Sequence, residues 1–461
     1  MEKYLEFREK YKTFTYEGYQ YFIEDGLLKV VYDFDIDGLD HFSPYWKFDM
    51  GKRNIDELMI DETFDNMVFS LGMVELISYW KICCPKEVII KGRFLNDEQI
   101  KWWKELYYLG LGEYFYTNHI ETSVEEFMTI VPEGEKKYVV DDNVKKINEE
   151  MFEGCLVPIG GGKDSVVSLE LLKKTNNRIR PFIINPRGAT LNTVSVGGFD
   201  DELITAKRIL DKNMIRLNGE GFLNGHTPYS AIVAFSTTIV AYLNKLRYIT
   251  LSNEASANES TVKGSDVNHQ YSKSFKFEKD FHHYEEKYLG SGTMYFSLLR
   301  PLSEFQIARF FAKQKQYHDI FRSCNVGSKE DIWCGHCSKC LFVYLILSPF
   351  LSDEELVKIF GVRMTDDQSM QEDFEKLIGM LEEKPFECVG SREEVNAAVT
   401  MTIRDMESKG MNLPYLFEYY KTTHLYNENK DREYTFFSEY NDENLLPEQF
   451  AKLVRENAVE A

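Results

Sequence analysis

Near the start of the chain, apolar and polar positions alternate in the way that is typical of strands with one buried face. The alternation spans residues 13–50 and is interrupted by Asp-Gly pairs at residues 25–26 and 37–38. Such pairs favour tight turns between antiparallel strands. The elements expected next are an amphipathic helix at 66–80 and a strand at 87–91. We therefore predict an α/β N-terminal domain over residues 1–148.

From residue 154 onward, short apolar runs alternate with stretches of helical periodicity. This spacing is the strand-helix-strand pattern of a parallel sheet. The predicted strands cover residues 155–159, 180–185, 214–218 and 248–252, and the predicted helices cover residues 164–174, 201–211 and 229–245. The fold class is therefore α/β, with a central parallel-sheet domain over residues 149–345.

The longest apolar stretch without a charge runs from Thr227 to Asn244 and is interrupted by hydroxyl side chains. Thr227 is placed to cap a helix, and Pro228 fits the first helical position. The stretch therefore predicts a buried core helix rather than a membrane span.

After Cys340 the periodicity becomes helical, which predicts a helical C-terminal region over residues 346–461. The expected helices cover residues 341–351, 353–360, 369–383 and 392–409. The last thirty residues are acidic and poor in aromatic side chains after Phe437. We expect this tail to pack loosely.

Composition and charge narrow the function classes. Of the 461 residues, 43% are hydrophobic and 28% are charged, so the chain can bury real cores and is not a disordered or fibrous protein. The 54 Lys and Arg residues face 75 Asp and Glu residues, and the formal net charge of −21 argues against a nucleic-acid partner. The charged N-terminus lacks the apolar segment of a secretory signal. We expect a cytoplasmic protein that has no membrane contact and needs no obligate protein partner.

The strongest local motif is Pro-Ile-Gly-Gly-Gly-Lys-Asp-Ser at residues 158–165, between an apolar strand and an amphipathic helix. Glycines at such a turn let backbone N–H groups approach an anion, and the helix N-terminus adds a partial positive charge. A Walker P-loop is excluded because Asp164 separates Lys163 from Ser165. A glycine-rich turn without a ligand explains the Lys-Asp-Ser sequence less well than a phosphate-binding loop does.

This loop resembles the Ser-Gly-Gly-x-Asp-Ser loop of the ATP pyrophosphatase (PP-loop) superfamily, whose members split ATP between the α and β phosphates and adenylate a substrate. The resemblance implies an adenine nucleotide alpha hydrolase-like central domain that uses ATP and Mg²⁺. Gly160 departs from the pattern, because these families usually have Ser there. The residues implied to hold the phosphates are Gly160, Gly161, Gly162, Lys163, Asp164 and Ser165. Asp164 would lie near Mg²⁺, and Lys163 would either neutralise developing charge or point to solvent.

Four of the eight cysteines form one cluster, C-x9-C-x2-C-x2-C. Four thiolates at two tight turns favour a structural Zn²⁺ site, with an iron–sulfur cluster as the lesser alternative and uncoordinated thiols as the least favoured one. The ligands would be Cys324, Cys334, Cys337 and Cys340. His336 is expected to face solvent because four sulfurs complete the site. The remaining cysteines, Cys83, Cys84, Cys155 and Cys388, are interpreted as buried thiols.

The order of a pyrophosphate loop, a Pro-Leu segment at residues 300–303 and this cysteine pattern resembles 7-cyano-7-deazaguanine synthases over residues 155–341. Two further segments are dense in polar groups, Ser-Asn-Glu-Ala-Ser-Ala-Asn from residue 252 and Val-Asn-His-Gln-Tyr-Ser-Lys-Ser from residue 267. From composition alone, solvated loops explain both segments equally well.

Together with the loop and the cysteine cluster, these segments are similar to the UDP-N-acetylmuramoyl-L-alanyl-L-glutamate epimerases of peptidoglycan precursor synthesis. That resemblance implies a small-molecule substrate, the UDP-muramoyl dipeptide, whose terminal L-Glu is converted to D-Glu while ATP yields AMP and pyrophosphate. Adenylation would remove the negative charge beside Cα and make the Cα proton removable by a side chain.

The candidate roles follow from these segments. The proposed catalytic residues are His269, Lys273, Glu254 and Asp164, and His282 and His283 carry less weight because they lie in a charged run. Beyond the loop, the expected nucleotide contacts are Asn185 and Arg187. The expected substrate-binding residues are Asn253, Asn258, Asn268, Gln270 and Arg300.

Three alternatives stay open. The first is an amidoligase like 7-cyano-7-deazaguanine synthase, although the residues before and after the central domain suggest a larger substrate. The second is an adenylating tRNA modifier, which the net charge disfavours. The third is a non-catalytic nucleotide- and zinc-binding protein, for which Gly160 in place of Ser is the best argument.

Overall fold

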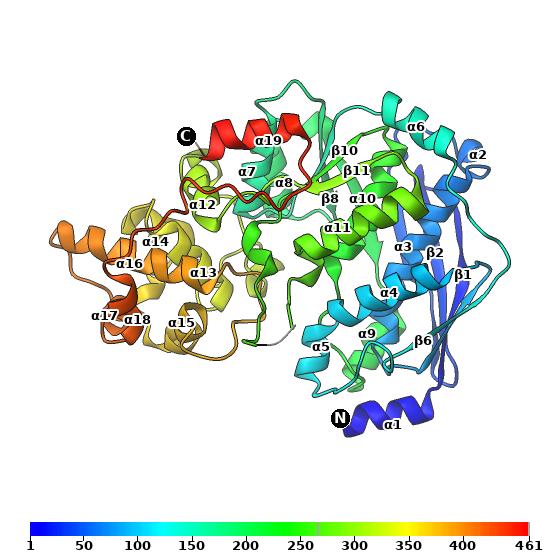
Figure 1. Cartoon of the computed structure of the whole chain (residues 1–461), viewed down its shortest axis with the longest axis horizontal. Coiled ribbons are helices and arrows are strands. Elements are labelled where there is room, and N and C mark those ends of the chain that lie inside the picture. The colour runs from blue at the N-terminus through cyan, green and yellow to red at the C-terminus, as the bar shows by residue number, and fades with distance from the viewer. Residues whose placement is uncertain (265–266, 460–461) are drawn as a thin grey trace.

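The computed structural model describes residues 1–264 and 267–459, and all predicted site residues lie in these ranges. The described strands form one mixed sheet in the order β11-β10-β7-β8-β9-β4-β2-β1-β5-β6, with β3 beside β2 (Figure 1). The strands are β1 Thr13–Glu24, β2 Leu27–Ile36, β3 Asp40–Phe42, β4 Tyr45–Phe48, β5 Glu87–Lys91, β6 Thr129–Glu133, β7 Cys155–Pro158, β8 Ile179–Ile184, β9 Ile204–Ile209, β10 Tyr248–Leu251 and β11 Met294–Ser297. The predicted α/β class is confirmed.

The sheet has a parallel half and a largely antiparallel half. Strands β11, β10, β7, β8 and β9 are all parallel to their neighbours, as the strand-helix-strand pattern predicts. Strands β1, β2, β3 and β4 pair antiparallel, and the first turn lies at Asp25 and Gly26, as predicted. Strand β4 pairs antiparallel with β9, so the two halves form one sheet. The predicted division at residues 148 and 149 therefore separates segments that share this sheet.

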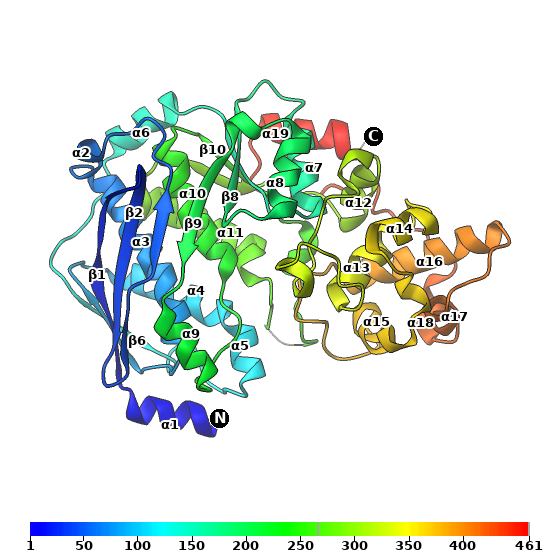
Figure 2. The same ribbon diagram turned by 180° about the vertical axis from the view of Figure 1, so that it is seen from behind.

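Helices pack against the sheet, and those of the C-terminal region extend the molecule to the side away from β1 and β2 (Figure 2). In the first half of the chain they are α1 Glu2–Lys10, α2 Ile55–Leu58, α3 Glu62–Trp80, α4 Asp97–Gly110, α5 Gly112–Thr117, α6 Asp142–Met151, α7 Lys163–Leu172, α8 Gly188–Gly197, α9 Lys212–Gly219 and α10 Tyr229–Leu243. In the second half they are α11 Phe275–Tyr284, α12 Glu304–Ala312, α13 Ser338–Leu347, α14 Asp353–Phe360, α15 Gln371–Ile378, α16 Arg392–Ser408, α17 Tyr415–Lys421, α18 His424–Asn429 and α19 Glu448–Val454.

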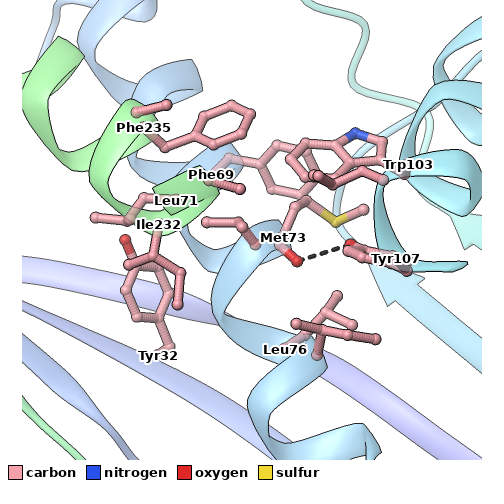
Figure 3. Packing of buried hydrophobic residues seen from close by; sticks show 14 of the residues in the cluster. Tyr32, Phe69, Leu71, Met73, Leu76, Trp103, Tyr107, Ile232 and Phe235 are labelled. Carbon is pink, nitrogen blue, oxygen red and sulfur yellow. Dashed lines mark hydrogen bonds between the residues drawn. The ribbon is translucent and has the colours of Figure 1, made fainter. Parts of the chain in front are cut away.

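The larger core is built around α3, which is buried along nearly its whole length. Figure 3 shows its side chains against those of α4 and α10. The rings of Trp103 and Phe235 stack with centroids 5.2 Å apart, and the hydroxyl of Tyr107 donates to the carbonyl oxygen of Met73 over 2.7 Å. Aromatic packing of this kind explains the many Trp, Tyr and Phe residues of the N-terminal segment.

The helical C-terminal region forms a second core with α7 and α12. Helix α14 matches its prediction and α16 agrees to within one residue. Helix α13 begins and ends three to four residues earlier than expected, and α15 is shorter than expected. The expectation of a loosely packed tail is wrong. Phe450 of α19 is fully buried and packs on Tyr248 of β10 with ring centroids 5.1 Å apart. A few apolar side chains at helical spacing outweigh the acidic composition of the segment.

Two elements of the central segment were predicted in the wrong phase. Residues 204–209 form β9 instead of a helix, and residues 212–219 form α9 instead of a strand. The cause is α8, Gly188–Gly197, whose small and β-branched residues gave no clear helical periodicity. The predicted capping role of Thr227 is also wrong, because Pro228 occupies the N-cap position of α10.

Helix α10 is buried inside the protein, as expected for a core helix. Among the described residues, no helix has the length and apolar character needed to cross a membrane.

Candidate active site

The glycine loop joins the end of β7 to the start of α7, at the carboxyl edge of the parallel strands. Gly162 is the N-cap residue of α7, and no side chain caps this helix. Gly161 has φ +84°, and an added Cβ would lie 3.0 Å from the Cβ of Ala189. Both the conformation and the close approach require glycine there. The local geometry is that of an anion-binding helix N-terminus.

Gly160 differs from Gly161, because a Cβ at Gly160 would meet no atom within 4 Å. Its backbone does not have a positive φ, and the residue is exposed. The serine that is usual at this position in PP-loop proteins would therefore fit without strain. Its absence removes a hydroxyl group but leaves the shape of the loop intact.

Lys163 does not point to solvent, because its side chain is only 4% exposed. Its Nζ lies 2.5 Å from Oδ1 of Asp164 and 2.6 Å from Oε2 of Glu304. Burial lowers the pKa of Lys163, but the charges of Asp164 and Glu304 outweigh this effect and raise it. Lys163 is therefore a permanent cation beneath the loop.

Buried carboxyl groups surround this lysine. Burial raises the pKa of Glu304 to about 8, although the charge of Lys163 opposes that rise. Burial also raises the pKa of Glu394, whose Oε1 accepts from the backbone N–H of Glu304 over 2.7 Å. Burial would raise the pKa of Asp164, but the ammonium group of Lys163 lowers it. Asp164 is thus the ionised carboxylate at the loop, with its side chain 32% exposed.

The structure places the other predicted nucleotide contacts differently from one another. Arg187 donates from Nη2 to the carbonyl oxygen of Gly160 over 3.4 Å, so it lies at the loop. Asn185 bonds the backbone N–H and the carbonyl oxygen of Arg208 on β9. Ser165 donates to the carbonyl oxygen of Gly162 over 3.0 Å. Arg187 thus lies at the glycine loop, whereas the Asn185 side chain connects two strands.

The predicted substrate-binding amides make mainly local bonds. Asn253 bonds Ser297, Asn258 accepts from the N–H of Phe275, and Asn268 bonds the backbone of Ala257 and Gln270. These amides shape the loops that follow β10.

Gln270 is an exception among them. It is 4% exposed, and its Nε2 donates to the carbonyl oxygen of Val389 over 3.1 Å. Its Oε1 is buried without a hydrogen-bond partner among the described residues.

Arg300 lies beneath the site, because its side chain has no exposed area. It pairs with Glu278 at 2.9 Å and donates to the backbone oxygens of Glu254 and Lys273. The guanidinium group thus fixes the backbone of two predicted catalytic residues. Arg300 is a positioning residue in this geometry and does not reach a ligand.

His269 and Lys273 lie together in the structure, and both meet a residue that the sequence did not indicate. The Nζ of Lys273 donates to the Sγ of Cys388 over 3.2 Å. The Nδ1 of His269 bonds the carboxylate of Glu113, and its ring also forms a hydrogen bond with Cys388. Cys388 is only half-buried, so its interpretation as a buried thiol is wrong. Nothing in the sequence near Cys388 or Glu113 marks these contacts, because the partners are 115 and 156 residues apart.

The cluster of His269, Lys273 and Cys388 has shifted pKa values. Burial raises the pKa of Cys388, but the charge of Lys273 and the hydrogen bond with His269 lower it to about 6. Burial lowers the pKa of His269, but its hydrogen bonds with Cys388 and Glu113 raise it to about 9. The pKa of Lys273 is also raised, because the charges of Cys388 and Glu254 outweigh burial. At neutral pH the thiol is therefore a thiolate beside two cations.

The cluster of His269, Lys273 and Cys388 and the glycine loop interact electrostatically. The charge of Asp164 helps to raise the pKa of Lys273, and the charge of Lys339 lowers the pKa of both Asp164 and Cys388. Glu254, which is 5% exposed, raises the pKa of both Lys163 and Lys273. His282 and His283 lie on α11 outside this group, and His283 is exposed beside Glu98.

His226 completes the cluster. Its Nδ1 is 3.5 Å from Glu113, and its ring centroid is 4.4 Å from that of His269. Burial and the charge of His269 lower its pKa to about 4, so it stays neutral. Glu113, His226 and His269 offer ligand atoms within 4.8 Å of one another. In this structure Glu113 and His269 also bond each other directly.

The four clustered cysteines meet the requirements of a tetrahedral metal site. The Sγ–Sγ distances are 3.9 Å for Cys324 and Cys337, 3.7 Å for Cys334 and Cys340, and 3.5 Å for Cys337 and Cys340. Zn–S bonds of about 2.3 Å place tetrahedral sulfurs about 3.8 Å apart. His336 is exposed, as predicted. The cluster is compatible with zinc.

The segment that carries these cysteines packs directly on the glycine loop. The N–H of Arg322 donates to the carbonyl oxygen of Gly161 over 2.8 Å, and a Cβ on Gly162 would lie 3.2 Å from the Cβ of Ser323. Asp331 accepts from the N–H of Ala189 in the first turn of α8. A metal held by the cysteines would therefore stabilise the loop from behind.

Comparison with known proteins finds matches over most of the chain. Residues 6–298 match the family described as the MurL N-terminal domain, and residues 320–427 match the MurL C-terminal domain. A protein of Micromonospora sp. named UDP-N-acetyl-alpha-D-muramoyl-L-alanyl-L-glutamate epimerase is 33% identical over 345 residues, which is 74% of this chain and 75% of the relative. Proteins with the same name from Salinispora tropica and Xanthomonas oryzae pv. oryzae are each 32% identical, over 84% and 74% of this chain and 84% and 75% of their own lengths.

Proposed function

The chain belongs to the MurL family, and on this premise we propose that it inverts the terminal L-Glu of UDP-N-acetylmuramoyl-L-Ala-L-Glu to D-Glu in peptidoglycan precursor synthesis. The names of three relatives with 32–33% identity over most of the chain support this role. We further propose that the reaction depends on ATP and proceeds through an acyl-adenylate, with release of pyrophosphate and AMP.

The chemistry of the substrate explains why ATP would be needed. A carboxylate next to Cα makes the Cα proton very weakly acidic, because removing the proton places a second negative charge beside the first. Adenylation of that carboxylate removes its charge, so an ordinary side chain can take the proton. Hydrolysis of the adenylate after inversion releases AMP and the D-Glu product.

The glycine loop fits the ATP half of the reaction. Its helix N-terminus and the buried Lys163 offer positive potential to phosphate groups, and Arg187 lies at the loop. Asp164 supplies an ionised, partly exposed carboxylate of the type that holds Mg²⁺, which would neutralise phosphate charge. The open space beside Gly160 leaves a passage for an oxygen of the leaving pyrophosphate.

The cluster at His269 and Lys273 fits the inversion half. Inversion needs one group that removes the Cα proton and another that supplies a proton to the opposite face. His269 and Lys273 both have raised pKa values and are protonated at neutral pH. They therefore fit the role of proton donor, and neither fits the role of base. Glu254, buried between the loop and the cluster, helps to keep both lysines charged.

The single observation that carries this proposal is the electrostatic interaction between Lys273 and Asp164, whose charge helps to raise the pKa of Lys273. It couples the group proposed for proton transfer to the loop proposed for adenylation. An enzyme that activates a carboxylate and then removes the adjacent proton needs both in one site. The cysteine cluster, which is compatible with zinc, would support the loop and takes no part in the chemistry.

The test incubates the protein with ATP, Mg²⁺ and UDP-N-acetylmuramoyl-L-Ala-L-Glu and follows pyrophosphate, AMP and D-Glu. We expect one AMP for each D-Glu formed. The variant Asp164→Ala should lose pyrophosphate release while keeping its metal content, and the exposed Asp201→Ala serves as the matched control. Formation of D-Glu without AMP would overturn the adenylation step. AMP formation only with another carboxylate and ammonia would support the amidoligase instead.

A further inference from the structure

We propose that Cys388 is the base that removes the Cα proton, held in place by hydrogen bonds from Lys273 and His269. The inference deepens the proposed epimerase function and rests on it. It assigns a role to the sulfur that both cations of the cluster bond. No local pattern in the sequence marks Cys388, and the geometry of the cluster carries the assignment.

Two hydrogen-bond donors hold the sulfur of Cys388. Lys273 donates to its sulfur over 3.2 Å, and His269 forms a second hydrogen bond to it. His269 is oriented in turn by Glu113. A thiol that is hydrogen-bonded to a histidine, which is in turn hydrogen-bonded to a carboxylate, is the arrangement that activates cysteines in enzymes. Cys388 as a residue is only half-buried, unlike Cys83, Cys84 and Cys155.

Gln270, which is 4% exposed, bonds the chain next to Cys388. Its Nε2 holds the carbonyl oxygen of Val389, the residue after Cys388, while its Oε1 has no hydrogen-bond partner among the described residues. A buried amide oxygen without a partner carries a free-energy cost unless a ligand group donates to it. An N–H group of the substrate peptide would satisfy this oxygen beside the sulfur.

Three basic side chains face the sulfur of Cys388. Lys273 and His269 face Cys388 from the segment before α11, and Lys339 faces it from α13. Glu387 adjoins it in the chain, and burial raises the pKa of that carboxyl group. The positive neighbours thus outnumber the ionised negative ones. They lower the pKa of Cys388 to about 6, although burial opposes this, so the thiolate predominates at neutral pH.

Other cysteines outside the metal cluster show the contrast. Burial raises the pKa of Cys155 to about 12, and burial likewise raises that of Cys84 to about 12. Both are buried. A low thiol pKa is therefore a property of the position of Cys388 and not of this chain's cysteines in general.

The proton balance closes with one water molecule, a reactant that hydrolysis of the adenylate also uses. The Cα–H bond of the glutamyl adenylate breaks, an S–H bond forms at Cys388, and the electron pair moves to the carbonyl oxygen of the activated carboxyl group. Lys273 bonds the sulfur over 3.2 Å and so lies on the same side of Cα as the base. On the opposite face an O–H bond of water therefore breaks as the new C–H bond forms. The thiol then gives its proton to the hydroxide ion, which restores the thiolate and the water.

The first test separates proton removal from adenylation. In D₂O, wild-type protein should incorporate one deuterium at Cα for each inversion. Cys388→Ala and Cys388→Ser should reduce this incorporation by about 10²- to 10⁴-fold, the usual contribution of a general base. Both variants should retain ATP–pyrophosphate exchange with the L-Glu substrate, because the glycine loop is unchanged. Incorporation within about threefold of wild type in a folded Cys388→Ala variant would overturn the proposal.

The two proposals fail in different ways. If wild-type protein incorporates deuterium without forming AMP, the adenylation step is wrong, and the effect of Cys388→Ala on incorporation still decides the role of the sulfur. If AMP forms and both variants incorporate deuterium normally, adenylation stands and Cys388 is not the base.

The second test needs no turnover. Iodoacetamide alkylation of Cys388, followed by peptide mass spectrometry, should rise with pH around a midpoint near 6, while the buried Cys155 reacts slowly and serves as the internal control. His269→Gln should move the midpoint upward by at least one pH unit. The exposed variant His283→Gln should leave it unchanged. A wild-type midpoint above 8, near that of an ordinary thiol, would contradict the proposal.

Discussion

The backbone N–H of Arg322 donates to the carbonyl oxygen of Gly161 over 2.8 Å. Arg322 lies two residues before Cys324, and Gly161 lies in the loop proposed to hold phosphate. The segment that leads into the cysteine cluster therefore bonds the loop at Gly161, the residue with a positive φ. The cysteine cluster and the glycine loop are thus connected through the backbone.

Removal of the metal should therefore weaken the ATP half of the reaction. We expect Cys334→Ser to lower the zinc content below one per chain and pyrophosphate release by about 100-fold, because small displacements of a site can have effects of this size. Zinc analysis and pyrophosphate assays check this expectation. Cys155→Ala, a change at a buried cysteine outside the cluster, is the control. Full activity in a zinc-free variant would show that the cluster does not support the loop.

The three loop glycines should respond differently to substitution. Gly160→Ser places its side chain in open space, so we expect the free energy of unfolding to change by less than about 0.5 kcal/mol. ATP binding should remain or improve, because the new hydroxyl group can reach phosphate. Gly161→Ala combines a positive φ with a contact of 3.0 Å to Ala189 and should abolish pyrophosphate release. Nucleotide-binding titrations and thermal unfolding of both variants test this contrast.

Arg300 should act on catalysis through position rather than contact. Arg300→Met removes the guanidinium group that holds the backbone oxygens of Glu254 and Lys273, and it leaves Glu278 buried without its partner. We expect a loss of about 3–5 kcal/mol in the free energy of unfolding and a fall in kcat larger than any rise in KM.

The matched control for this prediction is the double variant Arg300→Met with Glu278→Leu. It replaces both charges by apolar groups, so it should recover most of the stability. It cannot recover the hydrogen bonds to Glu254 and Lys273, and kcat should stay low. Recovery of kcat together with stability would show that Arg300 contributes only to folding.

Local patterns predicted the parts of the site that are contiguous in sequence. The glycine loop could be found because strand, glycines and helix follow one another at residues 155–172, and the cysteine cluster because three of its ligands lie within seven residues. The antiparallel strands were marked by their alternation and by their Asp-Gly turns. In each case a short-range rule determines the geometry.

Long-range contacts account for what was missed. Cys388 reaches Lys273 across 115 residues, and Glu113 reaches His269 across 156. No spacing rule connects such positions, and a single cysteine in a helical region has no local signal. Arg300 bonds the backbone of two candidate residues, but a sequence cannot show whether a guanidinium group faces a ligand or the backbone beneath it. Helix α8 was missed because its residues have weak helical propensity and only tertiary packing maintains it.

The pH dependence of the reaction should report the cluster directly. The proposed base, Cys388, acts only when deprotonated, and its lowered pKa of about 6 means that kcat/KM should fall about tenfold per pH unit below that value. The thiolate needs its cationic neighbours, and His269 loses its proton as the pH rises through about 9, so kcat/KM should fall again above that value. His226, with a pKa near 4, stays neutral throughout and adds no limb. The result is a bell-shaped pH profile of kcat/KM between about pH 6 and 9, which belongs to the interacting groups as a unit.

His269→Gln should remove the alkaline limb and move the acid limb upward, because the thiolate loses a hydrogen-bond donor. Steady-state kinetics from pH 5 to 10, with His283→Gln as the exposed control, test this profile. A rate that keeps rising to pH 10 would point instead to a neutral lysine as the base.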